Sequence, residues 1–264
     1  MVLPLQCVIV FRKGIILLLL SMMITSGAAY AADMGDELTQ WGHDAKALVA
    51  APLDWEATDW FWFETGIALT AASSLLDRRL YRQWNGASGV AKFGNAWAFA
   101  APAGVILFYG ARGLFDDDDR AMQTAGTYVE AAAFSLLATG LLKVATGRER
   151  PVQPGTNNGQ FHPGSFNDAR TSFPSGHVAL AFSVVGVLSA QRGVPWWAAP
   201  LAAVGGSVTM FARVRDKRHW ASDTVAAALI GFGIGRFVGT RRDGSGFQPM
   251  LTSAGGGVEW RTRF

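Results

Sequence analysis

The chain has 264 residues, of which 50% are hydrophobic and 16% are charged, and its formal net charge is +3. This length suits one domain, and the apolar content allows either a large interior or several membrane segments. Basic residues lie in short clusters beside apolar blocks, without the aromatic-interleaved stripe typical of nucleic-acid binding, so no nucleic-acid partner is expected. The single cysteine, Cys7, lies in a segment expected to be removed, which leaves no thiol for disulfide, metal or redox chemistry.

The first 32 residues have the pattern of a signal peptide. Arg12 and Lys13 precede a short apolar run over 15–24, and small residues ending in Ala31 and Ala32 supply a cleavage site. An uncleaved anchor helix is the alternative, although the apolar run is short for a membrane span. Both interpretations predict that the chain enters an export pathway.

The rest of the chain predicts an all-α fold. A polar segment over 33–59 is followed by six apolar blocks, at 60–76, 94–110, 125–142, 178–190, 196–211 and 221–240. Their Ala, Leu, Val and Phe residues lack the alternation of strands, so we expect a bundle of about six helices over 60–243. Glycines at every fourth position of 231–239 favour close approach of another helix. The tail over 244–264 is expected to be irregular or a short hairpin.

The blocks also predict a membrane-embedded bundle. Most of them fall short of the roughly 20 residues that a span needs, so a soluble periplasmic bundle stays open. Arg241 and Arg242 after the last block predict a cytoplasmic C-terminus and place the loops around 147–176 and 213–219 outside. With a cytoplasmic C-terminus, six spanning blocks would put the start of the mature chain inside, whereas a cleaved signal leaves it outside. One early block, at 60–76, is therefore expected not to span.

Two clusters of polar residues border the apolar blocks on either side of a Gly-, Asn- and Pro-rich loop. Lys143 and Arg150 end one helix before Pro151, and an ammonium with a guanidinium fork offers two complementary ways to hold phosphate oxygens. Ser175 and His177 lie in the string Pro-Ser-Gly-His that begins the next helix, together with Gly176. Ser175 is a good N-cap, and the free amides of such a helix start point toward a bound anion.

The third cluster consists of Arg213, His219 and Asp223. Residues four apart share a helix face, so the Asp223 carboxylate is expected to accept the imidazole N–H of His219 and leave the other ring nitrogen free to attack. Taken alone, an acidic residue at a helix start beside a surface histidine is the ordinary alternative.

Together, the three clusters resemble the signature of the type 2 phosphatidic acid phosphatase (PAP2) and vanadium haloperoxidase superfamily. The pattern K-x6-RP matches Lys143 to Pro151, PSGH matches Pro174 to His177, and the pattern R-x5-H-x3-D matches Arg213 to Asp223. Ala212 departs from the serine usual in the family. The resemblance covers about residues 125–240 and suggests an exported bacterial membrane phosphatase.

The resemblance implies a phosphatase that works through a phosphohistidine on His219, oriented by Asp223, with His177 as general acid and base. Lys143, Arg150, Arg213 and the amides after Ser175, including that of Gly176, would bind phosphate. These cations make a metal unnecessary, so no metal or cofactor is expected. The site would face the periplasm from the inner membrane, and the substrate would be a phospholipid, a polyprenyl pyrophosphate or lipid A. A soluble periplasmic acid phosphatase, a vanadate-dependent haloperoxidase and a non-enzymatic membrane assembly factor are the alternatives.

Overall fold

The computed structural model describes residues 31–83, 88–152, 157–243, 246–252 and 255–261. The predicted signal peptide, residues 1–32, therefore lies almost entirely outside the described residues. The chain forms two compact units, 1–51 and 52–264. In the first unit, helix α2 (Ala31–Ala50) covers most of the polar segment. A 3-10 turn, η1 (Ala51–Leu53), follows it in the chain and spans the boundary between the two units.

The described part of the second unit is a bundle of six long helices, which confirms the all-α prediction. They are α3 (Ala57–Gln83), α4 (Gly89–Phe115), α5 (Asp119–Thr146), α6 (Gly176–Ala190), α7 (Ala198–Arg215) and α8 (Ala221–Arg242). A short turn, η2 (Asp168–Arg170), lies in the long connection between α5 and α6. In the tail, β1 (Gly246–Thr252) pairs antiparallel with β2 (Gly255–Arg261), so its described residues form the hairpin that was one of the two expectations.

Helix α6 occupies the middle of the bundle and contacts α4, α5, α7 and α8. It is apolar all round, as expected for a helix with neighbours on every side. Its contact with α8 is made backbone to backbone, because a side-chain carbon at Gly231 would collide with the carbonyl of Ala179, and one at Gly235 with the carbonyl of Ser183. The close approach predicted from the glycine spacing is thus confirmed.

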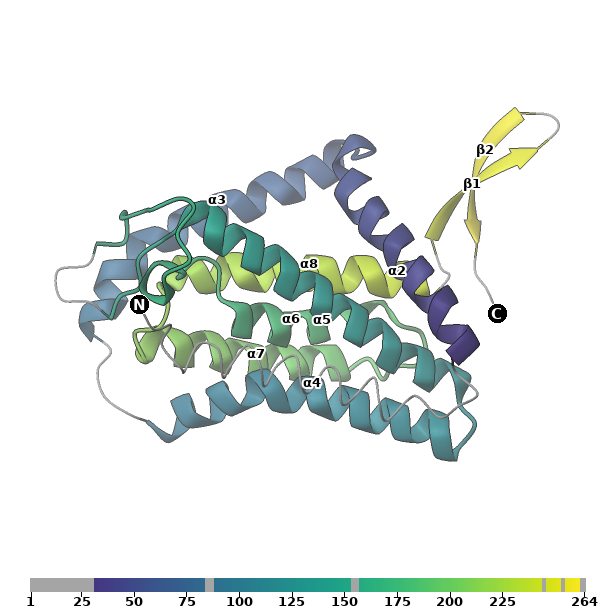
Figure 1. Ribbon diagram of the computed structural model, residues 1–264, viewed down its shortest axis with the longest axis horizontal. Coiled ribbons are helices and arrows are strands. Elements are labelled where there is room, and N and C mark those ends of the chain that lie inside the picture. The colour runs from purple at the N-terminus through teal and green to yellow at the C-terminus, as the bar shows by residue number, and fades with distance from the viewer. Residues whose placement is uncertain (1–30, 84–87, 153–156, 244–245, 253–254, 262–264) are drawn as a thin grey trace. The chain divides into compact units, whose positions relative to one another are not determined.

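Consecutive helices of the bundle run in alternating directions, as Figure 1 shows. The C-terminal ends of α3, α5 and α7 therefore meet the N-terminal ends of α4, α6 and α8 at one end of the bundle, where the connection 147–175 also lies. All three sequence clusters belong to this end.

Gly147 turns the chain from α5 into that connection. It adopts a left-handed conformation with φ of 56°, and its N–H donates to the carbonyl of Lys143 at 2.9 Å. A side chain at Gly147 would also collide with the carbonyl of His162. Only glycine satisfies both conditions at low cost, so this position fixes how residues 148–150 return toward the other helices.

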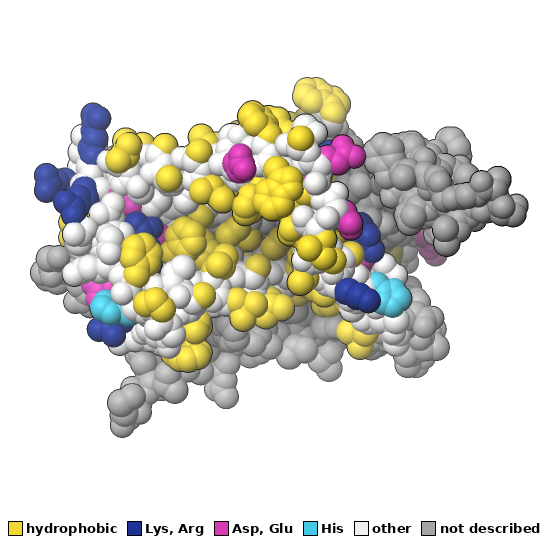
Figure 2. All heavy atoms as spheres, turned by 90° about the horizontal axis from the view of Figure 1, so that it is seen from above, with side chains coloured by type: hydrophobic (Ala, Val, Ile, Leu, Met, Phe, Trp, Pro, Cys, Tyr) yellow, Lys and Arg dark blue, Asp and Glu magenta, His cyan; other side chains and the backbone are white. Residues whose placement is uncertain are grey.

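The outer surface of the bundle is unusually apolar. Among the described residues, α4, α5 and α8 are long and apolar enough to cross a membrane, and α3, expected not to span, is not in that group. Figure 2 shows hydrophobic side chains over much of the face in view. Across the described residues, hydrophobic side chains that are more than half exposed include Trp62, Ile67 and Leu75 of α3, Leu107 and Phe115 of α4, Leu141 of α5, and Trp196 beside α7. Patches of this extent favour contact with lipid or another apolar partner.

Candidate active site

His219 lies in the turn between α7 and α8, and its side chain is 3% exposed. Its Nδ1 atom is 2.6 Å from the carbonyl oxygen of Ser172. Because a carbonyl oxygen only accepts hydrogen bonds, Nδ1 carries the proton and Nε2 keeps a free lone pair. The ring therefore has the tautomer that a nucleophilic Nε2 requires.

Asp223 does not accept this hydrogen bond, contrary to our expectation from the sequence. His219 precedes α8 and shares no helix face with Asp223, and its Nδ1 lies 3.8 Å from Asp223 Oδ2. That oxygen instead accepts from the Ser172 hydroxyl at 2.5 Å and from the N–H of Trp220 at 2.8 Å. Asp223 thus holds Ser172, and Ser172 holds the imidazole.

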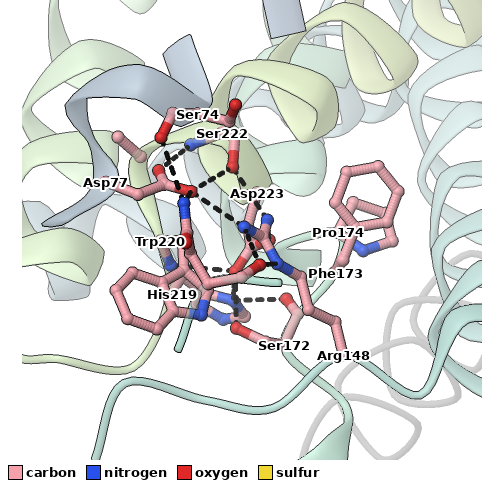
Figure 3. A network of polar contacts seen from close by, with 12 residues as sticks. Ser74, Asp77, Arg148, Ser172, Phe173, Pro174, His219, Trp220, Ser222 and Asp223 are labelled. Atoms are coloured by element: carbon pink, nitrogen blue, oxygen red, sulfur yellow. Dashed lines mark hydrogen bonds and ion pairs between the residues drawn. The ribbon is translucent and has the colours of Figure 1, made fainter. Parts of the chain in front are cut away.

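Arg148 completes this network, which Figure 3 shows from close by. Its guanidinium is buried and donates to Asp223 Oδ1 at 2.5 Å and to Asp77 Oδ2 at 2.8 Å. Sequence reasoning missed Asp77, Arg148 and Ser172. Arg148 occupies one of the six unspecified positions of the K-x6-RP motif, two residues before Arg150, which the motif does specify. No local pattern indicates which of the two arginines points inward.

Lys143 and Arg150 reach the same region from the end of α5 and the connection after it. Lys143 Nζ donates to the carbonyls of Thr171 and Pro174, at 2.7 and 2.6 Å. Arg150 donates to the carbonyls of Asp168 and Arg218, at 2.7 and 3.1 Å. These contacts order the loop segments that flank His177 and His219.

Arg213 comes from the last turn of α7 and is held by a residue that sequence reasoning also missed. Its Nη1 donates to Asn95 Oδ1 of α4 at 3.0 Å, and Asn95 Nδ2 donates to Asp216 Oδ2 at 2.6 Å. The Nε atom of Arg213 is buried without a hydrogen-bond partner. A buried cationic donor in this state is available to an anion.

The start of α6 supplies the remaining predicted residues. Ser175 is the N-cap by position, but its side chain makes no capping bond, and its buried Oγ has no hydrogen-bond partner. Its N–H donates to the carbonyl of Asp223 at 3.2 Å, which ties this turn to α8. Gly176 opens the helix, and the ring of His177 packs edge-on against Phe99 at 5.0 Å. The amides of a helix first turn lack intrahelical acceptors and attract anions.

The electrostatics of the two histidines show that the predicted residues converge. Burial, followed by the charges of Arg150, Lys143 and Arg213, lowers the pKa of His219 well below its usual 6.5. Burial and the same three cations also lower the pKa of His177. Burial, then Arg150 and Arg218, lowers the pKa of Arg213 to about 10. The site is therefore rich in positive charge, which favours the neutral form of both imidazoles while no anion is bound.

The chain is similar to known proteins over part of its length. The family model described as "PAP2 superfamily" matches residues 124–243. This region belongs to the PAP2 superfamily. The lipid A 1-phosphatase of Porphyromonas gingivalis is 36% identical over 69 residues, which cover 25% of this chain and 15% of that protein.

Among solved structures, the crystal structure of Aquifex aeolicus LpxE superposes with a TM-score of 0.45 at 21% identity. The superposition covers 62% of this chain and 92% of that one.

Proposed function

We propose that the chain is a metal-independent phosphatase that hydrolyses a phosphate ester or pyrophosphate of a membrane lipid through a phosphohistidine on His219. The observation that carries the proposal is the hydrogen bond from His219 Nδ1 to the Ser172 carbonyl, which leaves Nε2 unprotonated beside a cluster of phosphate-binding groups. A neutral imidazole with a free Nε2 is a competent nucleophile toward phosphorus.

The phosphate would bind where α5, α6 and α7 meet. Lys143, Arg150 and Arg213 would neutralise its oxygens, with the partnerless Arg213 Nε and Ser175 Oγ as further donors. Phosphoryl transfer depends mainly on such charge neutralisation and on in-line positioning.

The reaction would proceed in two steps. In the first, His177 takes up a proton from solvent once the bound phosphate offsets the neighbouring cations. His219 Nε2 then forms a bond to phosphorus while the bond to the leaving oxygen breaks, and His177 donates its proton to that oxygen. In the second, His177 takes a proton from water, the water oxygen bonds to phosphorus, and the P–N bond breaks. Phosphate leaves, His177 releases the proton to solvent, and both imidazoles are neutral again.

A lipid substrate is favoured by the surface around the site. Hydrophobic side chains such as Trp62, Leu107 and Leu141 are more than half exposed on the helices that lead to the pocket. Exposed apolar helices suit a bilayer and disfavour the alternative of a soluble periplasmic acid phosphatase. Lipid A leads the candidate substrates because the 69-residue match is to a lipid A 1-phosphatase.

The test is phosphate release by purified protein in detergent from lipid A, phosphatidic acid, phosphatidylglycerol phosphate and undecaprenyl pyrophosphate, with p-nitrophenyl phosphate as a soluble comparison. We expect turnover of a lipid substrate with kcat/KM at least about a hundredfold above that of the soluble ester. Equal turnover of both classes would favour the broad-specificity acid phosphatase. No turnover of any substrate would contradict the proposal.

A further inference from the structure

Asp77 is a buried carboxylate near the end of α3, outside the region 124–243 that matches the family model. It is 1% exposed, and both of its oxygens accept hydrogen bonds from the start of α8. Oδ1 accepts from the N–H of Ser222 at 2.9 Å, and Oδ2 accepts from the Ser222 hydroxyl at 2.8 Å. A carboxylate at this place accepts a hydrogen bond from a first-turn amide of α8, and its negative charge interacts favourably with the positive end of the α8 dipole.

The second partner of Asp77 is Arg148, whose guanidinium lies between two carboxylates. One side donates to Asp77 Oδ2 at 2.8 Å, and the other donates to Asp223 Oδ1 and to the Ser222 hydroxyl. The remaining donors, Nε and Nη2, reach the carbonyl of Asn158 at 3.0 and 2.8 Å. Figure 3 shows Asp77, Arg148, Ser222 and Asp223 as one connected group. The orientation of Arg148 is therefore fixed from both sides.

We propose that Asp77 is a positioning residue for the reaction at His219. It holds Arg148, Arg148 holds Asp223, and Asp223 holds the Ser172 hydroxyl, which fixes the carbonyl that accepts from His219 Nδ1. In this way a helix outside the family region determines which imidazole nitrogen is free to react. The kinetic part of this inference rests on the proposed phosphatase activity, whereas the tautomer of His219 does not.

The charges of the group support the same role. Asp77, Arg148 and Asp223 together carry one net negative charge close to His219. A phosphohistidine with Nδ1 protonated carries positive charge on its ring, which a buried negative charge stabilises. Without the Asp77 charge, the Arg148 and Asp223 pair is neutral and this stabilisation is lost.

The direct test is the tautomer of His219, measured by 15N NMR of imidazole-labelled protein in detergent. The chain has four histidines, and the His219 signals are those absent from His219→Gln. We expect a protonated Nδ1 and a bare Nε2 in the unmodified protein, and signals shifted toward a tautomer mixture in Asp77→Asn. Arg79→Ala removes an exposed charge two residues away on the same helix and should leave the signals unchanged.

Kinetics supply a second readout. Asp77→Asn should lower kcat by about tenfold or more while KM and inhibition by inorganic phosphate change less than about threefold, because Asp77 touches none of the proposed phosphate ligands. If Asp77→Asn does not fold, Arg148→Lys, which keeps the charge but loses the two-sided fork, should give the same NMR and kinetic changes.

Unchanged His219 signals in a folded Asp77→Asn protein would overturn the inference, as would a loss confined to KM or to the melting temperature. An unmodified protein that releases no phosphate would reject the proposed function, and the NMR comparison would still decide the role of Asp77.

Discussion

The carbonyl oxygen of Ser172 and Nδ1 of His219 lie 2.6 Å apart, and this contact assigns the proton on the ring. The sequence pattern predicted the side chain of Asp223 in that role, but Asp223 acts on His219 only through Ser172. Its Oδ2 binds the Ser172 hydroxyl instead. A backbone carbonyl cannot lose its place by changing rotamer, so the tautomer depends on how firmly the segment at Ser172 is held.

Replacing His219 with Ala should abolish turnover while leaving the bundle folded, because no neighbouring side chain can replace Nε2. The expected loss in kcat is at least about a hundredfold, the least that a covalent route contributes. Phosphate release measures it, and an unchanged melting temperature is the control for folding. Residual activity above roughly one part in a hundred would exclude His219 as the nucleophile.

Asp223→Asn should be less damaging than loss of His219. Asparagine keeps the size of the side chain and can still accept from Ser172, but it weakens the contact with Arg148. We expect kcat to fall by about tenfold to a hundredfold, with a lower melting temperature from the altered buried pair. A loss equal to that of His219→Ala would mean that Asp223 takes part in the chemistry directly.

These two predictions also mark how far the sequence alone could go. Spacing singled out His177, His219 and Arg213 as candidates because each lies in a short motif whose residues are close together in the sequence. It could not identify Asp77, because its partners Arg148 and Ser222 lie 71 and 145 residues away along the chain. The same holds for Asn95, which contacts Arg213 across 118 residues. Contacts of this kind depend on helix packing, which no local pattern encodes.

The helices were easier to predict than their ends. Five of the six apolar blocks lie within one long helix, and the block at 196–211 begins two residues before α7, because burial or lipid contact requires a run of apolar residues. Helix α3 continues beyond the first apolar block to Gln83, and Asp77, the residue that follows this block, is buried and contacts Arg148. In the sequence, a carboxylate directly after an apolar block indicates the end of a helix. In the fold, Asp77 lies within α3 and is buried.

The pKa of His177 should rise when phosphate binds. In the free protein, burial and then Arg213 and Lys143 lower this pKa, so the ring is neutral near pH 6.5. A phosphate dianion in the pocket offsets those cations and favours the protonated ring that a general acid requires. NMR titration with and without inorganic phosphate measures the shift. No upward shift at His177 would contradict the assignment.

Activity should persist in EDTA, because Lys143, Arg150 and Arg213 provide the charge that Mg²⁺ supplies in other phosphoryl-transfer sites. Vanadate, which adopts the five-coordinate geometry of the transferring group, should inhibit. Arg213→Gln should raise its inhibition constant by about tenfold or more, the usual contribution of a charged hydrogen bond.

Arg215→Ala is the matched control for Arg213→Gln, because Arg215 lies on the same helix turn and packs over Phe211. This variant should keep the vanadate sensitivity of the unmodified protein. Loss of activity in EDTA with recovery on adding Mg²⁺ would contradict the metal-independent route.

The connection that contains Phe166 should face the periplasm, and Arg241 should face the cytoplasm, if the signal pattern and the positive-inside rule both hold. Phe166 is 82% exposed, so a cysteine there is open to reagents. In a Cys7→Ser background, Phe166→Cys should react with an impermeant thiol reagent on intact spheroplasts, and Arg241→Cys should not. Labelling of both would indicate a soluble periplasmic bundle, and labelling of Arg241→Cys alone would reverse the orientation.

The glycine contact between α6 and α8 means that a substitution far from the candidate site can affect the reaction. His177 begins one of these helices and Asp223 lies in the first turn of the other, so the backbone contact at Gly231 and Gly235 sets the offset between them. Replacing Gly235 with Ala would force α6 and α8 apart at a point two to three helical turns away from the candidate site. A displacement of catalytic groups by about 1 Å costs on the order of a hundredfold in rate. A change in a residue without any functional group would then have the phenotype of an active-site mutation.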